Sequence, residues 1–187
     1  HPRMHRRRRR HVLGLRRRRR SAAVCLNETY SVLRIPSHYA IRNTQYQMSL
    51  IIPTNLYSSI IDHLESAYPN EGAGLLLGIA NENDKTVKSV LKFENKFEAG
   101  EQYHRYLISA EDMFKGETEA EKLGMDVIGV FHSHPDHPSQ ASEYDREYAL
   151  PWYSYLIVSV QKGKTSTAQS WLLSDDRKTF VEESVEL

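Results

Sequence analysis

The charges of this chain divide at Met48, and the division limits the folded part to about three quarters of its length. Residues 1–47 contain 13 Arg, no Lys and one acidic residue, and runs of five Arg occupy 6–10 and 16–20. The remaining residues carry 9 Lys and 3 Arg against 23 acidic residues. Blocks of like charge repel one another and cannot bury a core. We therefore expect one globular domain over 48–187.

Three interpretations of the Arg-rich arm, residues 1–47, stay open. We favour a disordered leader or a non-native upstream segment, with Met48 as the natural start, because every basic residue of the arm is Arg and no amphipathic repeat is present. Alternatively, the arm neutralises the phosphates of a nucleic acid or of an anionic membrane. Scarce acidic residues are also typical of transit peptides. Outside the arm we expect no nucleic-acid partner.

The composition argues against two further classes of protein. One cysteine, Cys25, can form neither an internal disulfide nor a thiolate zinc cluster. The richest apolar stretch, at 74–80, is far shorter than the roughly 20 residues of a membrane-spanning helix. We therefore expect a soluble protein from a reducing, cytoplasmic setting, without a membrane partner.

The hydrophobic pattern of the domain predicts a mixed α/β (α+β) fold. A helical pattern begins after Pro53 and stops at Tyr68, and Ser109 is placed to cap a second helix that ends at Gly124. A third, short helix is expected at 142–150. A short apolar segment opens the domain at 50–52, and strands are expected at 75–79, 87–93, 106–108, 126–134, 155–160, 167–173 and 180–185.

The strand at 126–134 carries the most informative pattern. A period of two places four residues on one face, Ile128, Val130, His132 and His134, so that both imidazoles project to the same side. Asp145, on the short helix that follows, can return a carboxylate to them. Two imidazoles and a carboxylate provide three of the four tetrahedral ligands of zinc and leave one position for water. An open position is typical of a catalytic zinc site, whereas structural sites are closed.

Five residues match the motif of a known family: Glu71, His132, His134, Ser142 and Asp145. The spacing His-x-His-x7-Ser-x2-Asp, with a glutamate upstream next to glycines, resembles the JAMM (MPN-plus) metalloprotease motif. Segments 68–78 and 153–159 also look like the small stand-alone bacterial and archaeal members, of the CysO-cysteine peptidase type. The resemblance covers about 49–183 and implies an MPN/JAB domain. Such a domain has a central, mixed, curved β-sheet flanked by helices and is similar to cytidine deaminases.

The resemblance implies a role for each matching residue. His132, His134 and Asp145 match the ligands of one zinc ion per chain. Glu71 matches the carboxylate that accepts a proton from water and passes it to the leaving amine. Ser142 matches the hydroxyl that supports the developing oxyanion. The implied reaction is the hydrolysis of an amide bond.

The resemblance also implies a protein substrate. Members of the family cleave after the C-terminal Gly-Gly of ubiquitin-like or sulfur-carrier proteins, so we expect such a partner for a chain that is a monomer or a homodimer. One alternative is a non-catalytic MPN scaffold that binds a ubiquitin-like partner, although a scaffold should have lost one or more ligands. A RadC-like JAMM protein is another, with the same motif spacing but different residues in between. Nucleobase deaminases and zincins are excluded, since neither Pro-Cys-x-x-Cys nor His-Glu-x-x-His occurs.

Overall fold

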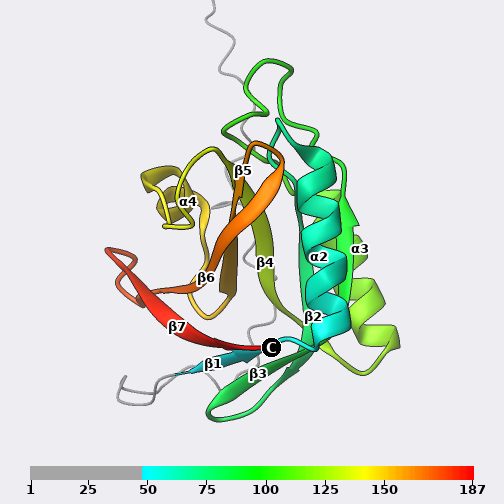
Figure 1. Cartoon of the computed structure of the whole chain (residues 1–187). Helices are drawn as coiled ribbons and strands as arrows, with labels where there is room; N and C mark the ends of the chain where they lie inside the picture. The colour runs from blue at the N-terminus through cyan, green and yellow to red at the C-terminus, as the bar shows by residue number, and fades with distance from the viewer. Residues whose placement is uncertain (1–47) are drawn as a thin grey trace, which may run out of the picture. The chain divides into compact units, whose positions relative to one another are not determined.

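The computed structural model describes residues 48–187 (Figure 1). The interpretations of the Arg-rich arm lie outside these residues and stay predictions. In order, the elements are β1 (Ser49–Ile51), α2 (Thr54–Ala67), β2 (Ala73–Ala80), β3 (Asp84–Phe93), α3 (Ala110–Lys122), β4 (Asp126–Pro135), α4 (Glu143–Tyr148), β5 (Ser154–Gln161), β6 (Lys164–Leu173) and β7 (Phe180–Glu186). Within 48–187 every helix falls short of the length and apolar character that a bilayer span requires.

The strands close into a barrel in the order β1-β3-β2-β4-β5-β6-β7. The mixed α/β class is confirmed, but the strands form a closed barrel and not the curved sheet that the resemblance implied. Closure depends on β1, which pairs in parallel with both β3 and β7. At its end the Ile52 amide donates to the Glu186 carbonyl at 2.8 Å. The first and last strands of the domain thereby pair the backbone N–H and C=O groups that an open sheet would leave exposed at its edges.

The predicted helices and all but one of the predicted strands are present. The exception is the strand expected at 106–108, because residues 94–109 form neither helix nor strand. Hydrogen bonds from side chains, and not the backbone hydrogen bonds of a strand, fix this segment, which we call the 94–109 loop. The Asn95 amide donates to the carbonyls of Glu71 at 2.9 Å and Arg105 at 2.8 Å, and Gln102 donates to the Asn95 carbonyl at 3.0 Å. The loop is therefore fixed next to the start of β2.

The helices α2 and α3 pack on opposite faces of β2. Ile60 and Leu64 of α2 are fully buried in the same hydrophobic cluster as Leu76. On the other face, α3 approaches so closely at Gly116 that a Cβ there would lie 2.3 Å from Leu75 Cδ1. Since Leu75 and Leu76 are consecutive residues of one strand, they point to opposite sides. The strand β2 is thus buried on both faces, which explains its continuous apolar run.

The strand β4 runs antiparallel to β2 and parallel to β5. Its register against β2 shifts so that Leu76 lies opposite Gly129 while Leu77 lies opposite Val127. Because of this bulge, Ile128 does not follow the alternation of the strand. The Ile128 side chain lies in the core cluster that also contains Phe131. The expectation that Ile128 shares the face of the two histidines is therefore wrong.

Candidate metal centre

The short helix α4 places Asp145 through its N-terminal cap. Ser142 is the N-cap, and its Oγ accepts the Asp145 backbone N–H at 3.1 Å. In return, Asp145 Oδ2 accepts the Ser142 backbone N–H at 2.7 Å and the Ser142 hydroxyl at 2.6 Å. Reciprocal bonds of this kind form a capping box and fix both side chains. The carboxylate is therefore held in one orientation and is only 5% exposed.

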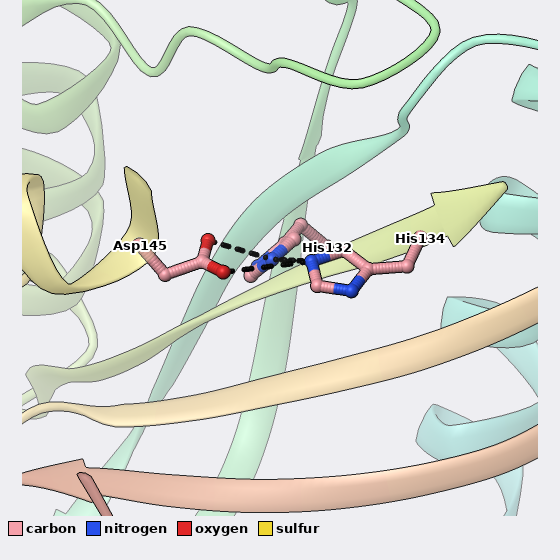
Figure 2. Close-up of side chains that lie close together, drawn as sticks. All are labelled: His132, His134 and Asp145. Atoms are coloured by element: carbon pink, nitrogen blue, oxygen red, sulfur yellow. Dashed lines mark hydrogen bonds and ion pairs between the residues drawn. The ribbon is translucent and has the colours of Figure 1, made fainter. Parts of the chain in front are cut away.

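Three side chains converge between β4 and α4, as Figure 2 shows. The Nε2 atoms of His132 and His134 are 3.1 Å apart. Asp145 Oδ1 lies 3.1 Å from His132 Nε2, and Asp145 Oδ2 lies 3.5 Å from His134 Nε2. A tetrahedral zinc ion with bonds of about 2.0–2.1 Å separates its ligand atoms by about 3.3–3.4 Å. The observed separations differ from this by tenths of an ångström, so the three residues could hold such an ion.

The orientation of the His134 ring also fits a metal ligand. Its Nδ1 lies 2.8 Å from the carbonyl oxygen of Pro138. A carbonyl oxygen can only accept, so Nδ1 carries the hydrogen and Nε2 keeps its lone pair when the ring is neutral. Metal-ligating histidines usually donate their second ring N–H to an acceptor of this kind. In the neutral ring, His134 Nε2 therefore directs its electron pair toward His132 and Asp145.

Electrostatics favours the protonation states that a metal requires at His132 and Asp145, whereas at His134 a metal would have to displace a proton. Burial lowers the pKa of the His132 imidazole, which favours the neutral ring. Burial alone would raise the pKa of Asp145, but the charges and hydrogen bonds of His132 and His134 hold it well below its usual range. The pKa of His134 is raised, since Asp145 outweighs the opposing effect of burial. An ionised carboxylate that draws a proton onto a neighbouring imidazole will attract a divalent cation in the same place.

Glu71 lies just before β2 and is 6% exposed. Its backbone is held on both sides by the 94–109 loop, because its N–H donates to the Gln102 carbonyl at 2.7 Å and its carbonyl accepts the Asn95 amide. Burial raises the pKa of its carboxyl group to about 8, and the charge of Asp145 adds to this while that of His134 opposes it. The Glu71 carboxyl group thus interacts electrostatically with the candidate metal ligands and has a pKa suited to proton transfer near neutral pH.

Some contacts of the site were not predicted from the sequence. Tyr106 stacks on the His132 ring at 4.5 Å between centroids, and Asn95 supports Glu71 from a distant segment. The carbonyl of Pro138 was also missed, although the Pro-Asp-His-Pro sequence of its loop is a turn signal that predicts a reversal after β4. The contacts of Asn95 and Tyr106 have no such local signal, because they depend on how a loop without regular structure folds back.

Three comparisons relate this chain to known proteins. A family model described as prokaryotic homologs of the JAB domain matches residues 53–174, which include all five motif residues. The chain is 28% identical over 130 residues to a desampylase of Pyrococcus furiosus, covering 70% of this chain and 85% of that protein. Solved structures from two bacteria are also similar. That of a Desulfitobacterium hafniense protein has a TM-score of 0.64 at 27% identity and covers 73% of this chain and 90% of its own. That of a Salinibacter ruber protein has a TM-score of 0.58 at 35% identity and covers 72% of this chain and 89% of its own.

Proposed function

The chain belongs to the family of prokaryotic homologues of the JAB domain, and we propose that it is a zinc-dependent peptidase or isopeptidase. The proposed substrate is the amide bond after the C-terminal Gly-Gly of a ubiquitin-like or sulfur-carrier protein. The observation that carries this proposal is the convergence of His132, His134 and Asp145 near the buried carboxyl group of Glu71. The similarity to a desampylase supports a ubiquitin-like modifier as the partner.

His132, His134 and Asp145 would hold one zinc ion. When bound, zinc supplies a Lewis acid that polarises a carbonyl group and lowers the pKa of water to about 7. The protein prepares for the ion by keeping His132 neutral, Asp145 ionised and the Nε2 lone pair of His134 directed inward. Two imidazoles and one carboxylate are the donor set typical of catalytic zinc, because they leave a coordination position open.

Glu71 is the proposed general base and acid. Its carboxylate accepts the proton of the attacking water, the C–N bond of the amide breaks, and the same carboxyl group returns the proton to the leaving amine. Two hydrogen bonds with the 94–109 loop fix the backbone of Glu71, from which the carboxyl group extends.

Ser142 is the proposed donor to the oxyanion that forms on the substrate carbonyl. Its hydroxyl donates to Asp145 Oδ2 at 2.6 Å, so donation to a substrate requires the hydroxyl to rotate. The Ser142 backbone N–H, 2.7 Å from the same oxygen, keeps Asp145 fixed during that rotation. Glycine is the proposed residue before the cleaved bond, because a residue without a side chain lets its backbone approach the metal ligands closely.

The test combines metal analysis with one isosteric substitution. The full chain should bind one zinc ion, hydrolyse adducts of Gly-Gly-terminated ubiquitin-like proteins, and lose this activity with a chelator. Glu71→Gln should keep the zinc and lose hydrolysis, whereas Glu121→Gln, on the exposed surface of α3, should change neither. A chain that binds the carrier protein equally with and without metal and never cleaves it would instead be a binding scaffold.

A further inference from the structure

Three consecutive carbonyl groups, those of residues 137–139 in the loop between β4 and α4, each accept a hydrogen bond from a different strand. The first accepts the hydroxyl of Ser159 on β5 at 2.6 Å and, more weakly, the side-chain amide of Gln161 on the same strand at 3.3 Å. The second accepts Nδ1–H of His134 on β4 at 2.8 Å, and the third accepts the indole N–H of Trp171 on β6 at 2.9 Å. The carbonyl that orients His134 is thus the middle one of three, and its two neighbours are anchored independently.

The three donors lie on one face of the barrel. The parallel register of β4 and β5 places Ser159 opposite His134. In the antiparallel pair of β5 and β6, Ser159 lies opposite Thr167, and Trp171 follows four residues later. Side chains two or four residues apart on a strand share a face. The loop therefore lies across three neighbouring strands and is bound to each of them.

Ser139 adds a side-chain anchor to the same loop. It is 1% exposed, and its Oγ donates to Gln169 Oε1 at 2.7 Å and lies 2.9 Å from Thr167 Oγ1. Ser159 is also buried, at 2% exposure. The other partners are less buried, because residues 137 and 138 and Thr167 are exposed and Trp171 is half-buried. The loop is therefore held by several partly buried contacts.

We propose that Ser159 and Trp171 are positioning residues for the zinc site. By fixing the outer two carbonyls, they keep the carbonyl of Pro138 aimed at Nδ1 of His134, and so keep the hydrogen on Nδ1 and the lone pair on Nε2. Without them the Pro138 carbonyl moves, and His134 can adopt the other tautomer, which cannot bind a metal through Nε2. This inference rests on the proposed function, because it assigns a role toward the zinc ion.

The test measures zinc affinity, which requires no substrate. Trp171→Phe removes the indole N–H while keeping an aromatic ring, and Ser159→Ala removes only the hydroxyl. Competition with a chromophoric chelator should show weaker zinc affinity than in the wild-type chain. The loss of about 10–100-fold that is usual when a ligand's direct partner is removed is the upper limit, because the Pro138 carbonyl itself remains. Two separate variants keep the test valid if one of them fails to fold.

Ser170→Ala is the matched control. Ser170 is a fully buried serine next to Trp171, but its Oγ donates to Glu183 Oε1 at 2.6 Å, on the opposite face of β6. The control should lower thermal stability and leave zinc affinity unchanged. If it weakens zinc binding as much as Ser159→Ala does, the effect is general destabilisation and the inference is overturned.

A second readout reports on the tautomer itself. In the metal-free protein at alkaline pH, where the ring of His134 is neutral, two-bond proton–nitrogen spectra should show hydrogen on Nδ1. Trp171→Phe and Ser159→Ala should shift part of the population to Nε2–H. Variants that keep both the tautomer and the wild-type zinc affinity would overturn the inference but not the proposed function. A wild-type chain that binds no zinc would overturn both.

Discussion

At the scale of single residues, the site depends on one carboxylate with two functions. Asp145 closes the capping box of α4 with its Oδ2, and both of its oxygens face the imidazoles of β4. An ionised, buried carboxylate is stable only with compensating partners. Here the partners are two imidazoles and the cap, and a divalent cation would add a stronger one. The helix terminus therefore provides the support that a metal ligand needs.

Asp145→Asn should abolish tight zinc binding with little loss of stability. The amide oxygen can still accept the Ser142 N–H, whereas the negative charge that a zinc ligand set requires is gone. Asp112→Asn is an unusually close control, because Asp112 forms the same capping box with Ser109 at the start of α3, where no histidine pair is present among the described residues. Zinc content after gel filtration distinguishes the two variants. Equal zinc retention by both would contradict the assignment of Asp145.

The buried Lys85 should make the stability of the fold depend on pH. It is fully buried, and its Nζ donates to the Trp152 carbonyl and, at 3.0 Å, to the Ser154 hydroxyl. Burial lowers its pKa from 10.5 to about 8, although the charge of Glu183 opposes the shift. Between these values the unfolded chain holds a proton that the folded chain has released. The free energy of unfolding should therefore rise from pH 8 to 10.5 by up to about 3 kcal/mol, and this gain is lost as pH falls through 8.

Urea unfolding of the wild-type chain and of Lys85→Met across this pH range measures the effect. Other groups titrate in both proteins, so the informative quantity is the difference between the two curves. That difference should grow in favour of the wild-type chain as pH rises. Parallel curves would show that Lys85 keeps its proton in the fold.

At the scale of elements, one helix cap and one long loop hold the residues of the proposed chemistry. The capping box at the start of α4 places Asp145, and the 94–109 loop supports Glu71. A serine at the N-cap of a helix contributes about 1 kcal/mol to the stability of the fold. A catalytic hydroxyl contributes in addition to the reaction rate, so the two roles can be separated by comparing the caps of α3 and α4.

Ser142→Ala and Ser109→Ala should each destabilise the fold by about 1 kcal/mol, because each removes one N-cap. Only Ser142→Ala should also lower kcat, by about 100–1,000-fold, which is typical for the loss of an oxyanion donor. Thermal unfolding and steady-state kinetics measure the two effects. If both variants keep wild-type kcat, Ser142 serves the fold alone.

Sequence reasoning succeeded where a signal was local. The cap at Ser109, the helix after Pro53 and the alternation that aligns His132 with His134 are all set by neighbouring residues, and the structure contains each of them. It failed at Ile128, because a bulge depends on the register against β2 and not on the strand's own letters. The contacts of Asn95 with Glu71 were missed for the same reason, since the two residues meet only after the chain has folded.

At the scale of the whole domain, the barrel depends on a strand of three residues. Leu50 is the central residue of β1, lies between β3 and β7, and is fully buried in the core cluster. Nothing in its sequence signals that it closes a barrel, since its partners lie about 35 and 135 residues away. This is why the closure of the sheet was not predicted from the sequence.

Leu50→Ala should destabilise the domain by about 2–5 kcal/mol, because it leaves a cavity where the first and last strands meet. Ile79→Ala, on a side chain that is 51% exposed, should cost much less. Chemical denaturation of both variants provides the comparison. A small loss for Leu50→Ala would mean that β1 contributes little to closure.

We also propose that residues 48–187 fold and bind zinc without the Arg-rich arm. A chain that starts at Met48 should match the full chain in thermal stability and zinc content. If the arm binds nucleic acid, only the full chain should bind it, with an affinity that falls steeply as salt rises. Loss of zinc binding in the shorter chain would show that the arm supports the site.

The most direct test of the account is anomalous diffraction at the zinc edge from crystals of the zinc-loaded chain. It should place one zinc ion bonded to Nε2 of His132, Nε2 of His134 and a carboxylate oxygen of Asp145, with the fourth position free of protein atoms. A fourth protein ligand, or zinc bound only elsewhere, would contradict the assignment of a catalytic centre.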